Sequence, residues 1–194
     1  MVYISFGSMV VLSQEQLTEM AFGVFNSRVS FLWVMRKGDT SFLWVMRKGD
    51  TSTGMKCGGL PEGFSEAGGE RGIEVHWRLQ TRVLSLPAVS CFVTHCRWNS
   101  TMEALSSGVP VVAFPQWGDQ VTNAKGEAED RVVGREEIKE CLMEATGGVK
   151  AKEMKKNSLK WKKAAAEAVE EGGSSDLNIE EFVDEIRKII RQST

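Results

Sequence analysis

The sequence has little of several features that mark special classes of protein. Its longest apolar runs, such as residues 109–114, are too short to cross a bilayer, and no N-terminal signal pattern is present. The net charge is only −2 over 194 residues, so nothing indicates a nucleic-acid partner. We therefore expect a globular protein in the cytoplasm, with neither a nucleic-acid nor a membrane partner.

Cysteine and histidine are scarce, with four cysteines and two histidines. The densest group is Cys91, His95 and Cys96, whose spacing fits no standard pair of zinc ligands. We expect reduced, buried thiols and no bound metal.

Three sequence motifs for binding phosphates are also missing. The chain contains no G-x-G-x-x-G, no G-x-x-x-x-G-K-[ST] and no Asp-x-Asp. These absences argue against a dinucleotide dehydrogenase, a P-loop enzyme and a metal-bridged diphosphate site, respectively.

Short apolar runs of strand length alternate with helical patterns along the chain. The runs are apolar throughout, as expected for strands covered on both faces. We predict an α/β fold, a Rossmann-like parallel sheet with helices on both faces, followed by a helical C-terminal tail. The predicted strands are 2–7, 31–36, 73–77, 90–95 and 109–114, and the helices include 13–26, 135–146, 150–171 and 177–191.

Two helices show a clear apolar face. The first begins at Ser13 or Gln14 and places Leu17, Met20, Ala21 and Val24 on one side. The last carries one apolar stripe, which we interpret as a packing face. That stripe consists of Ile179, Phe182, Val183, Ile186 and Ile190.

An eleven-residue segment, SFLWVMRKGDT, occurs twice in tandem, at 30–40 and 41–51. Two such copies make no solenoid, and the sheet needs only one of them. The second copy is predicted to be surplus, either looped out or paired with the first as a hairpin.

Residues 77–120 begin Trp-x-x-Gln, contain His-Cys-x-Trp-Asn-Ser and end Asp-Gln. This segment resembles the signature box of plant family 1 UDP-glycosyltransferases. The matching positions after Gln80 are His95, Cys96, Trp98, Asn99, Ser100, Glu103, Asp119 and Gln120. Outside the box, the chain looks most like plant glucosyltransferases that form 1-O-glucose esters of carboxylic acids.

The resemblance implies a role for each matching residue toward a UDP-sugar. Trp77 would stack on uracil, Gln80 would help to hold the nucleoside, and Glu103 would accept hydrogen bonds from the ribose. A terminal Gln120 accompanies glucose, so UDP-glucose is the expected donor, bound without a metal. Phosphate contacts are implied for Ser8, His95, Asn99 and Ser100, and sugar contacts for Trp98, Asp119 and Gln120.

The residues alone allow other interpretations. Ser100-x-x-Glu103 is also a capping box that needs no ligand. Trp77 is equally suited to the end of a buried strand, and the Trp-Gly-Asp-Gln at 117–120 to a turn and helix start.

The sequence departs from the family pattern at two important places. Arg97 occupies the position of a family glycine, which would supply either a positive φ or room beside the phosphates. We expect Arg97 to weaken diphosphate binding, with direct pairing to the diphosphate as the alternative. After Lys125, about fifteen residues of the family pattern are missing, including a strand that would form the sheet edge.

The resemblance covers only the C-terminal half of a two-domain GT-B glycosyltransferase. We expect residues 1–194 to form a single donor-binding domain, with the N-terminal acceptor domain and its catalytic base absent. The resemblance implies glucose transfer to a phenolic or carboxylic small molecule in the whole enzyme. The chain alone is expected to be a monomer without a catalytic residue. The alternative is a truncated, inactive remnant that still binds UDP-sugar.

Overall fold

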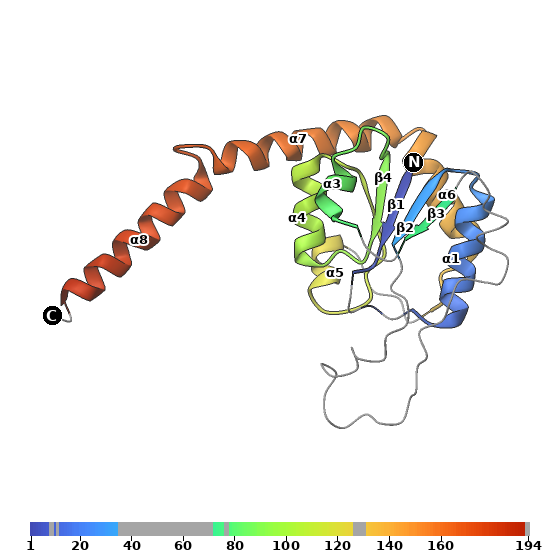
Figure 1. The fold of residues 1–194 in the computed structure, drawn as a ribbon, viewed down its shortest axis with the longest axis horizontal. Helices are drawn as coiled ribbons and strands as arrows, with labels where there is room; N and C mark the ends of the chain where they lie inside the picture. The colour runs from blue at the N-terminus through green and yellow to red at the C-terminus, as the bar shows by residue number, and fades with distance from the viewer. Residues whose placement is uncertain (8–9, 11, 35–71, 76–77, 126–130, 193–194) are drawn as a thin grey trace, which may run out of the picture.

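A parallel sheet forms the centre of the protein (Figure 1). The computed structural model describes residues 1–7, 10, 12–34, 72–75, 78–125 and 131–192. Within them the strand order is β3-β2-β1-β4-β5, and every neighbouring pair is parallel. The strands are β1 (Val2–Ser5), β2 (Phe31–Val34), β3 (Gly72–Val75), β4 (Cys91–Thr94) and β5 (Val111–Ala113). The predicted fold class is confirmed, with β1, β4 and β5 two to three residues shorter than their apolar runs.

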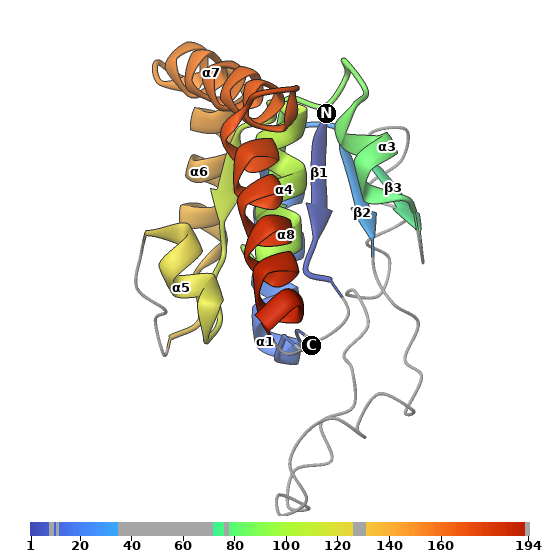
Figure 2. The same cartoon turned by 90° about the vertical axis from the view of Figure 1, so that its left-hand side faces the viewer.

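Helices cover both faces of the sheet (Figure 2). One face packs against α1 (Gln14–Asn26) and α6 (Arg135–Gly147), which contact each other closely. The other face packs against α3 (Gln80–Leu84) and α4 (Trp98–Ser107). The remaining helices are α5 (Asp119–Ala124), α7 (Ala151–Val169) and α8 (Ser174–Gln192). None of the described helices combines the length and apolar character needed to cross a membrane.

The alternation of strand side chains explains this two-sided core. Val2 and Ile4 of β1 point into the cluster with α1 and α6, whereas Tyr3 points into the cluster with α4. Tyr3 stacks on Phe92 of β4, with ring centroids 4.9 Å apart. The helix start predicted at Ser13 is confirmed, since its hydroxyl accepts a hydrogen bond from the Gln16 amide.

The duplicated segment and the predicted gap after Lys125 both affect which strands the sheet contains. The first copy of the duplication supplies β2, and the second lies outside the described residues. β5 and β3 are the two edge strands of the described sheet, and the loss of a further strand after Lys125 stays a prediction.

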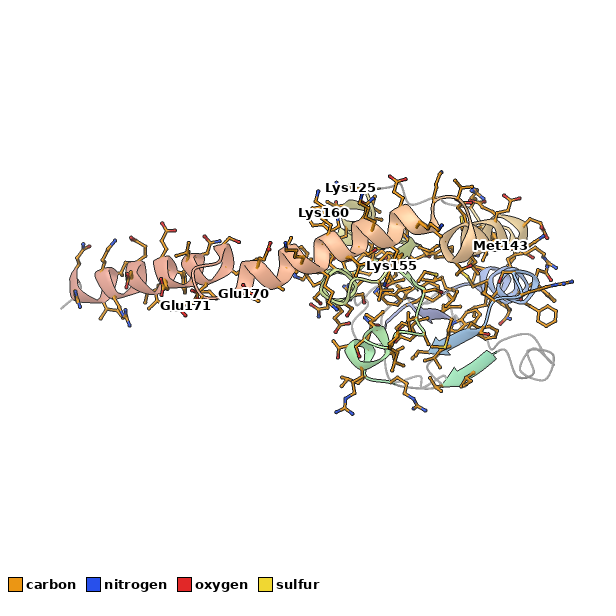
Figure 3. The ribbon with its side chains drawn as sticks, turned by 90° about the horizontal axis from the view of Figure 1, so that it is seen from above. Lys125, Met143, Lys155, Lys160, Glu170 and Glu171 are labelled. Carbon is orange, nitrogen blue, oxygen red and sulfur yellow. The ribbon has the colours of Figure 1, made fainter. Side chains whose placement is uncertain are left out.

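The apolar stripe of the last helix is not covered by the described part of the chain, so its role as a packing face stays a prediction. No residue of α8 is buried, and Phe182 is 66% exposed. The physical reason is the position of α8, which follows α7 away from the sheet, on the side of the face that α4 covers (Figures 1, 2 and 3).

Candidate functional site

The sheet order places a switch point between β1 and β4. The chain runs from β1 through α1 to β2 on one side, whereas β4 pairs with β1 on the other. Open α/β sheets bind ligands at such points, beyond the carboxyl ends of the strands. Gly7 and His95 meet there. A Cβ on Gly7, whose φ is +66°, would lie 3.0 Å from the His95 ring, so a larger residue would push this ring away.

His95 is a buried, neutral imidazole directly after β4. It is 2% exposed, and its Nδ1 lies 3.4 Å from the Thr94 hydroxyl. Burial, aided by the nearby positive charge of Arg97, lowers its pKa to about 4, although Asp119 opposes the shift. At neutral pH the ring therefore offers one N–H donor and one acceptor nitrogen without a charge.

The turn from β4 into α4 takes its strained conformation at Cys96. Cys96 has a φ of 62°, whereas Arg97 has an ordinary extended conformation, with φ −62° and ψ 153°. The possible left-handed conformation of Arg97 is thus ruled out, and room beside the ligand is the remaining role of the family glycine. The Thr101 hydroxyl and the Asn123 amide both donate to the Cys96 carbonyl and hold the turn.

Three of the predicted site residues are joined at the start of α4. The Gln80 side-chain amide donates to the Ser100 hydroxyl over 3.2 Å and also to the Glu103 carboxylate. Because α4 begins at Trp98 with Arg97 as its N-cap, Ser100 is the third helical residue. The capping-box interpretation of Ser100 and Glu103 is therefore wrong, since its serine must stand at the N-cap.

A second group surrounds Asp119, the first residue of α5. Its carboxylate accepts hydrogen bonds from the Trp98 backbone amide and the Asn123 side chain, each over 3.2 Å. The Arg97 Nε lies 4.0 Å from this carboxylate, and the guanidinium lies over the Trp117 ring, 5.4 Å from its centroid. Arg97 is thus directed toward Asp119, which is implied in sugar binding, so we expect it to weaken binding of the sugar rather than of the diphosphate.

Gln120 is buried, and its oxygen accepts from the backbone amides of Gln116 and Trp117. Its Nε2 has no acceptor in the described part of the chain, which leaves a buried donor unsatisfied. Trp98, in contrast, is 61% exposed, and Asn99 is also exposed.

The structure thus brings eight of the ten predicted site residues to the region around the start of α4. The other two, Ser8 and Trp77, lie outside the described residues, and their roles stay predictions. Sequence reasoning missed Gly7, Trp117 and Asn123. Asn123 stands four residues after Asp119 on a helix, the spacing at which side chains meet, and this signal was available.

A cavity of about 470 Å³ lies elsewhere, between α1, α6 and the segment after β5. None of the predicted site residues lines it. It borders the edge strand β5, and both polar and apolar side chains line it. Among the described residues, no cluster of three or more His, Cys, Asp or Glu side chains is suited to a metal ion.

Comparisons with known proteins agree with these features. The family described as "UDP-glucoronosyl and UDP-glucosyl transferase" matches residues 1–147. Cinnamate beta-D-glucosyltransferase of Fragaria ananassa is 54% identical over 97% of this chain, and limonoid UDP-glucosyltransferase of Citrus unshiu is 50% identical over 96%. The chain covers only 34% and 37% of these two proteins, respectively. The Fragaria alignment extends over 202 residues, more than the 194 of this chain, so that relative has residues without a counterpart here.

Solved structures also show similarity to proteins that bind UDP. The crystal structure of Os79 from O. sativa in complex with UDP is similar with a TM-score of 0.78 and 32% identity, over 95% of this chain and 40% of that protein. The parallel sheet is therefore that of a GT-B glycosyltransferase. The chain belongs to the family of UDP-glucuronosyl and UDP-glucosyl transferases, among the plant glucosyltransferases of family 1.

Proposed function

We propose that this chain is the donor-binding half of a UDP-glucose-dependent glucosyltransferase. The observation that carries the proposal is the hydrogen-bonded group of Gln80, Ser100 and Glu103 at the start of α4, beside the switch point of the sheet. The Glu103 carboxylate is suited to accept hydrogen bonds from a ribose diol. The Gln80 amide already contacts this carboxylate, so it is suited to orient Glu103 for that task.

The diphosphate would lie at the N-terminus of α4. Free backbone amides and the helix dipole favour an anion there. His95 adds a neutral hydrogen-bonding group at the end of β4, and Gly7 leaves space beside its ring. The proposed contacts from Ser8, Asn99 and Ser100 complete the phosphate site, and Trp77 would stack on the uracil.

The hexose would lie near Asp119, Gln120 and Trp98. Asp119 is 47% exposed and thus open to sugar hydroxyls, although Arg97 now competes for its carboxylate. The buried Nε2 of Gln120 supports a nearby acceptor, since a donor without a partner is costly. The glucosyltransferase names of the relatives support glucose as the transferred sugar.

Transfer itself would need a second substrate, a small phenolic or carboxylic acceptor, held next to the donor. The chain spans 34–40% of the first relatives, so this step would draw on the part of those proteins that it does not span. The alternative is a UDP-sugar-binding remnant without transferase activity. The contact between Arg97 and Asp119 favours that alternative, because it engages the carboxylate that the sugar hydroxyls would bind.

Calorimetric titration of the chain with UDP and UDP-glucose tests the proposal. We expect one site of micromolar affinity for each ligand, about −8 kcal/mol. A folded chain that gives no heat with either ligand contradicts donor binding. The chain alone is expected to form no glucose ester from cinnamate in either case. Adding the N-terminal part of the Fragaria relative, together with cinnamate, then separates the two, because only the donor half of an enzyme gains ester formation.

A further inference from the structure

Asn123 of α5 connects two parts of the proposed donor site that come from separate segments of the chain. Its side-chain amide nitrogen donates to the Cys96 carbonyl over 3.0 Å and to the Asp119 carboxylate over 3.2 Å. Cys96 belongs to the turn before α4, next to the proposed diphosphate position, whereas Asp119 belongs to the proposed sugar site. Both contacts are possible because α5 lies beside the start of α4 (Figure 1).

The residue type at position 123 is matched to these two partners. A carbonyl and a carboxylate oxygen both accept hydrogen bonds, so the amide nitrogen of Asn123 must face them, and its two N–H groups supply one donor for each. Aspartate has nearly the same shape but offers only acceptors when it is ionised, and leucine offers neither donor nor acceptor. Replacing Asn123 by either residue therefore removes both contacts without a large change of volume.

The two oxygen atoms of Asp119 have different surroundings. Oδ2 accepts from Asn123 and from the Trp98 backbone amide, each over 3.2 Å, and these two bonds use both of its lone pairs. Among the described residues no donor makes a hydrogen bond to Oδ1, and the Arg97 Nε lies 4.0 Å from it, beyond hydrogen-bonding distance. Oδ2 is therefore the anchored oxygen, and Oδ1 is left to accept from a ligand.

We propose that Asn123 is a positioning residue, which holds Asp119 so that Oδ1 faces the hexose of the donor. This role rests on the proposed function, because the sugar site is itself a proposal. Without Asn123, the Trp98 amide alone holds Oδ2, and the carboxylate turns toward the Arg97 guanidinium, a cation that pairs well with carboxylates. Asn123 thus keeps Asp119 available to the sugar in a chain that has an arginine beside it.

The sugar contact gives this role a measurable signature. UDP has no hexose, so its affinity depends on the turn at Cys96 but not on Asp119, whereas the affinity for UDP-glucose depends on both. We expect Asn123→Leu to weaken UDP-glucose at least about tenfold more than UDP, the effect of one hydrogen bond to a charged group. Asn123→Asp should lower the affinity ratio of UDP-glucose to UDP at least as far, because its carboxylate repels that of Asp119.

Thr101→Val is the matched control for the turn. The Thr101 hydroxyl donates to the same Cys96 carbonyl over 3.2 Å, whereas the hydrogen bonds to Asp119 in the described part of the chain come from Trp98 and Asn123. Thr101→Val should therefore weaken both ligands equally and leave their affinity ratio unchanged. Asn157→Asp, on the exposed surface of α7, controls for the added charge and should change neither affinity. Circular dichroism and thermal melts verify that each variant is folded.

The Trp98 backbone amide reports on the carboxylate in the absence of any ligand. Its N–H donates to Oδ2 of Asp119, so its proton chemical shift moves upfield when the carboxylate turns away. We expect this change in Asn123→Leu. A loss of overall stability would leave the resonance of the folded chain where it is, so the measurement separates positioning from a merely structural role.

Calorimetric titration with UDP and UDP-glucose gives the decisive comparison. An affinity ratio that falls in both Asn123 variants but not in Thr101→Val supports the role of Asn123. A native chain that binds both ligands, with the same ratio in Asn123→Leu, overturns this role and leaves the proposed function intact. A native chain that binds neither ligand overturns the proposed function and the sugar role together. An unmoved Trp98 amide in Asn123→Leu overturns the positioning of Asp119 in every case.

Discussion

Replacing Arg97 with glycine is expected to tighten UDP-glucose binding by about fivefold and to leave UDP binding nearly unchanged. In the structure the Arg97 Nε lies 4.0 Å from the Asp119 carboxylate, and the guanidinium lies over Trp117. A hexose that binds Asp119 must displace this contact. UDP has no hexose, so it does not compete for Asp119.

The magnitude follows from the contacts that are lost. The Arg97 side chain is 33% exposed and that of Asp119 is 47% exposed, so their ion pair contributes at most about 1 kcal/mol. Releasing this amount changes a dissociation constant about fivefold. Folding stability should change little, because Arg97 has an extended backbone with no strain for glycine to relieve. Any loss comes from the ion pair with Asp119, at most about 1 kcal/mol, and from the contact with Trp117, about 0.5 to 1 kcal/mol.

Calorimetry with both ligands measures the effect, and Arg97→Ala is the informative companion. Equal gains for alanine and glycine would identify the guanidinium as the obstacle. A gain with glycine alone would mean that the diphosphate needs room beside the backbone. Weaker binding of UDP and UDP-glucose in both variants would refute the reasoning, because it would show that Arg97 pairs with the diphosphate.

Three further predictions concern the site and the core. Glu103→Gln should weaken UDP about 10- to 100-fold, the range for a hydrogen bond to a charged group, whereas Glu153→Gln on α7 should leave titrations unchanged. The pKa of His95 is lowered to about 4, so between pH 6.5 and 4 the unfolded chain binds a proton that the folded chain excludes. Stability should therefore fall as the pH falls through this range, by at most about 3 kcal/mol, and urea unfolding of His95→Gln should lack this part of the pH dependence. Gly23→Ala should destabilise the chain by about 1 to 3 kcal/mol. Its Cβ would lie 2.7 Å from Ile138 of α6. Gly147→Ala, with open space around it, should be neutral or stabilising in the same thermal melts.

Much of the fold was predictable because it depends on local patterns. The buried strands are apolar throughout, and Ser13 is a strong N-cap, so β1 and α1 are evident in the sequence. The site residues were predictable only through their fixed spacing in 77–120. Without the resemblance, Ser100 and Glu103 predict a capping box, which the start of α4 at Trp98 contradicts.

Other features depend on contacts that a sequence pattern does not encode. The amphipathic pattern of α8 shows which face is apolar but not whether this chain covers it. The strain in the turn before α4 lies on Cys96 because the preceding strand and the helix start fix the backbone there. The sequence pattern instead indicated a positive φ at Arg97, one residue later, because glycine is the family residue at that position.

The central claim is that UDP binds at the switch point beside α4. Backbone amide chemical shifts measured during a UDP titration test it most directly. The account predicts that the largest changes fall on residues 95–101 and on Gln80, with the residues around the α1–α6 cavity unaffected. Changes confined to that cavity, near Gln16 and Phe114, would contradict the account.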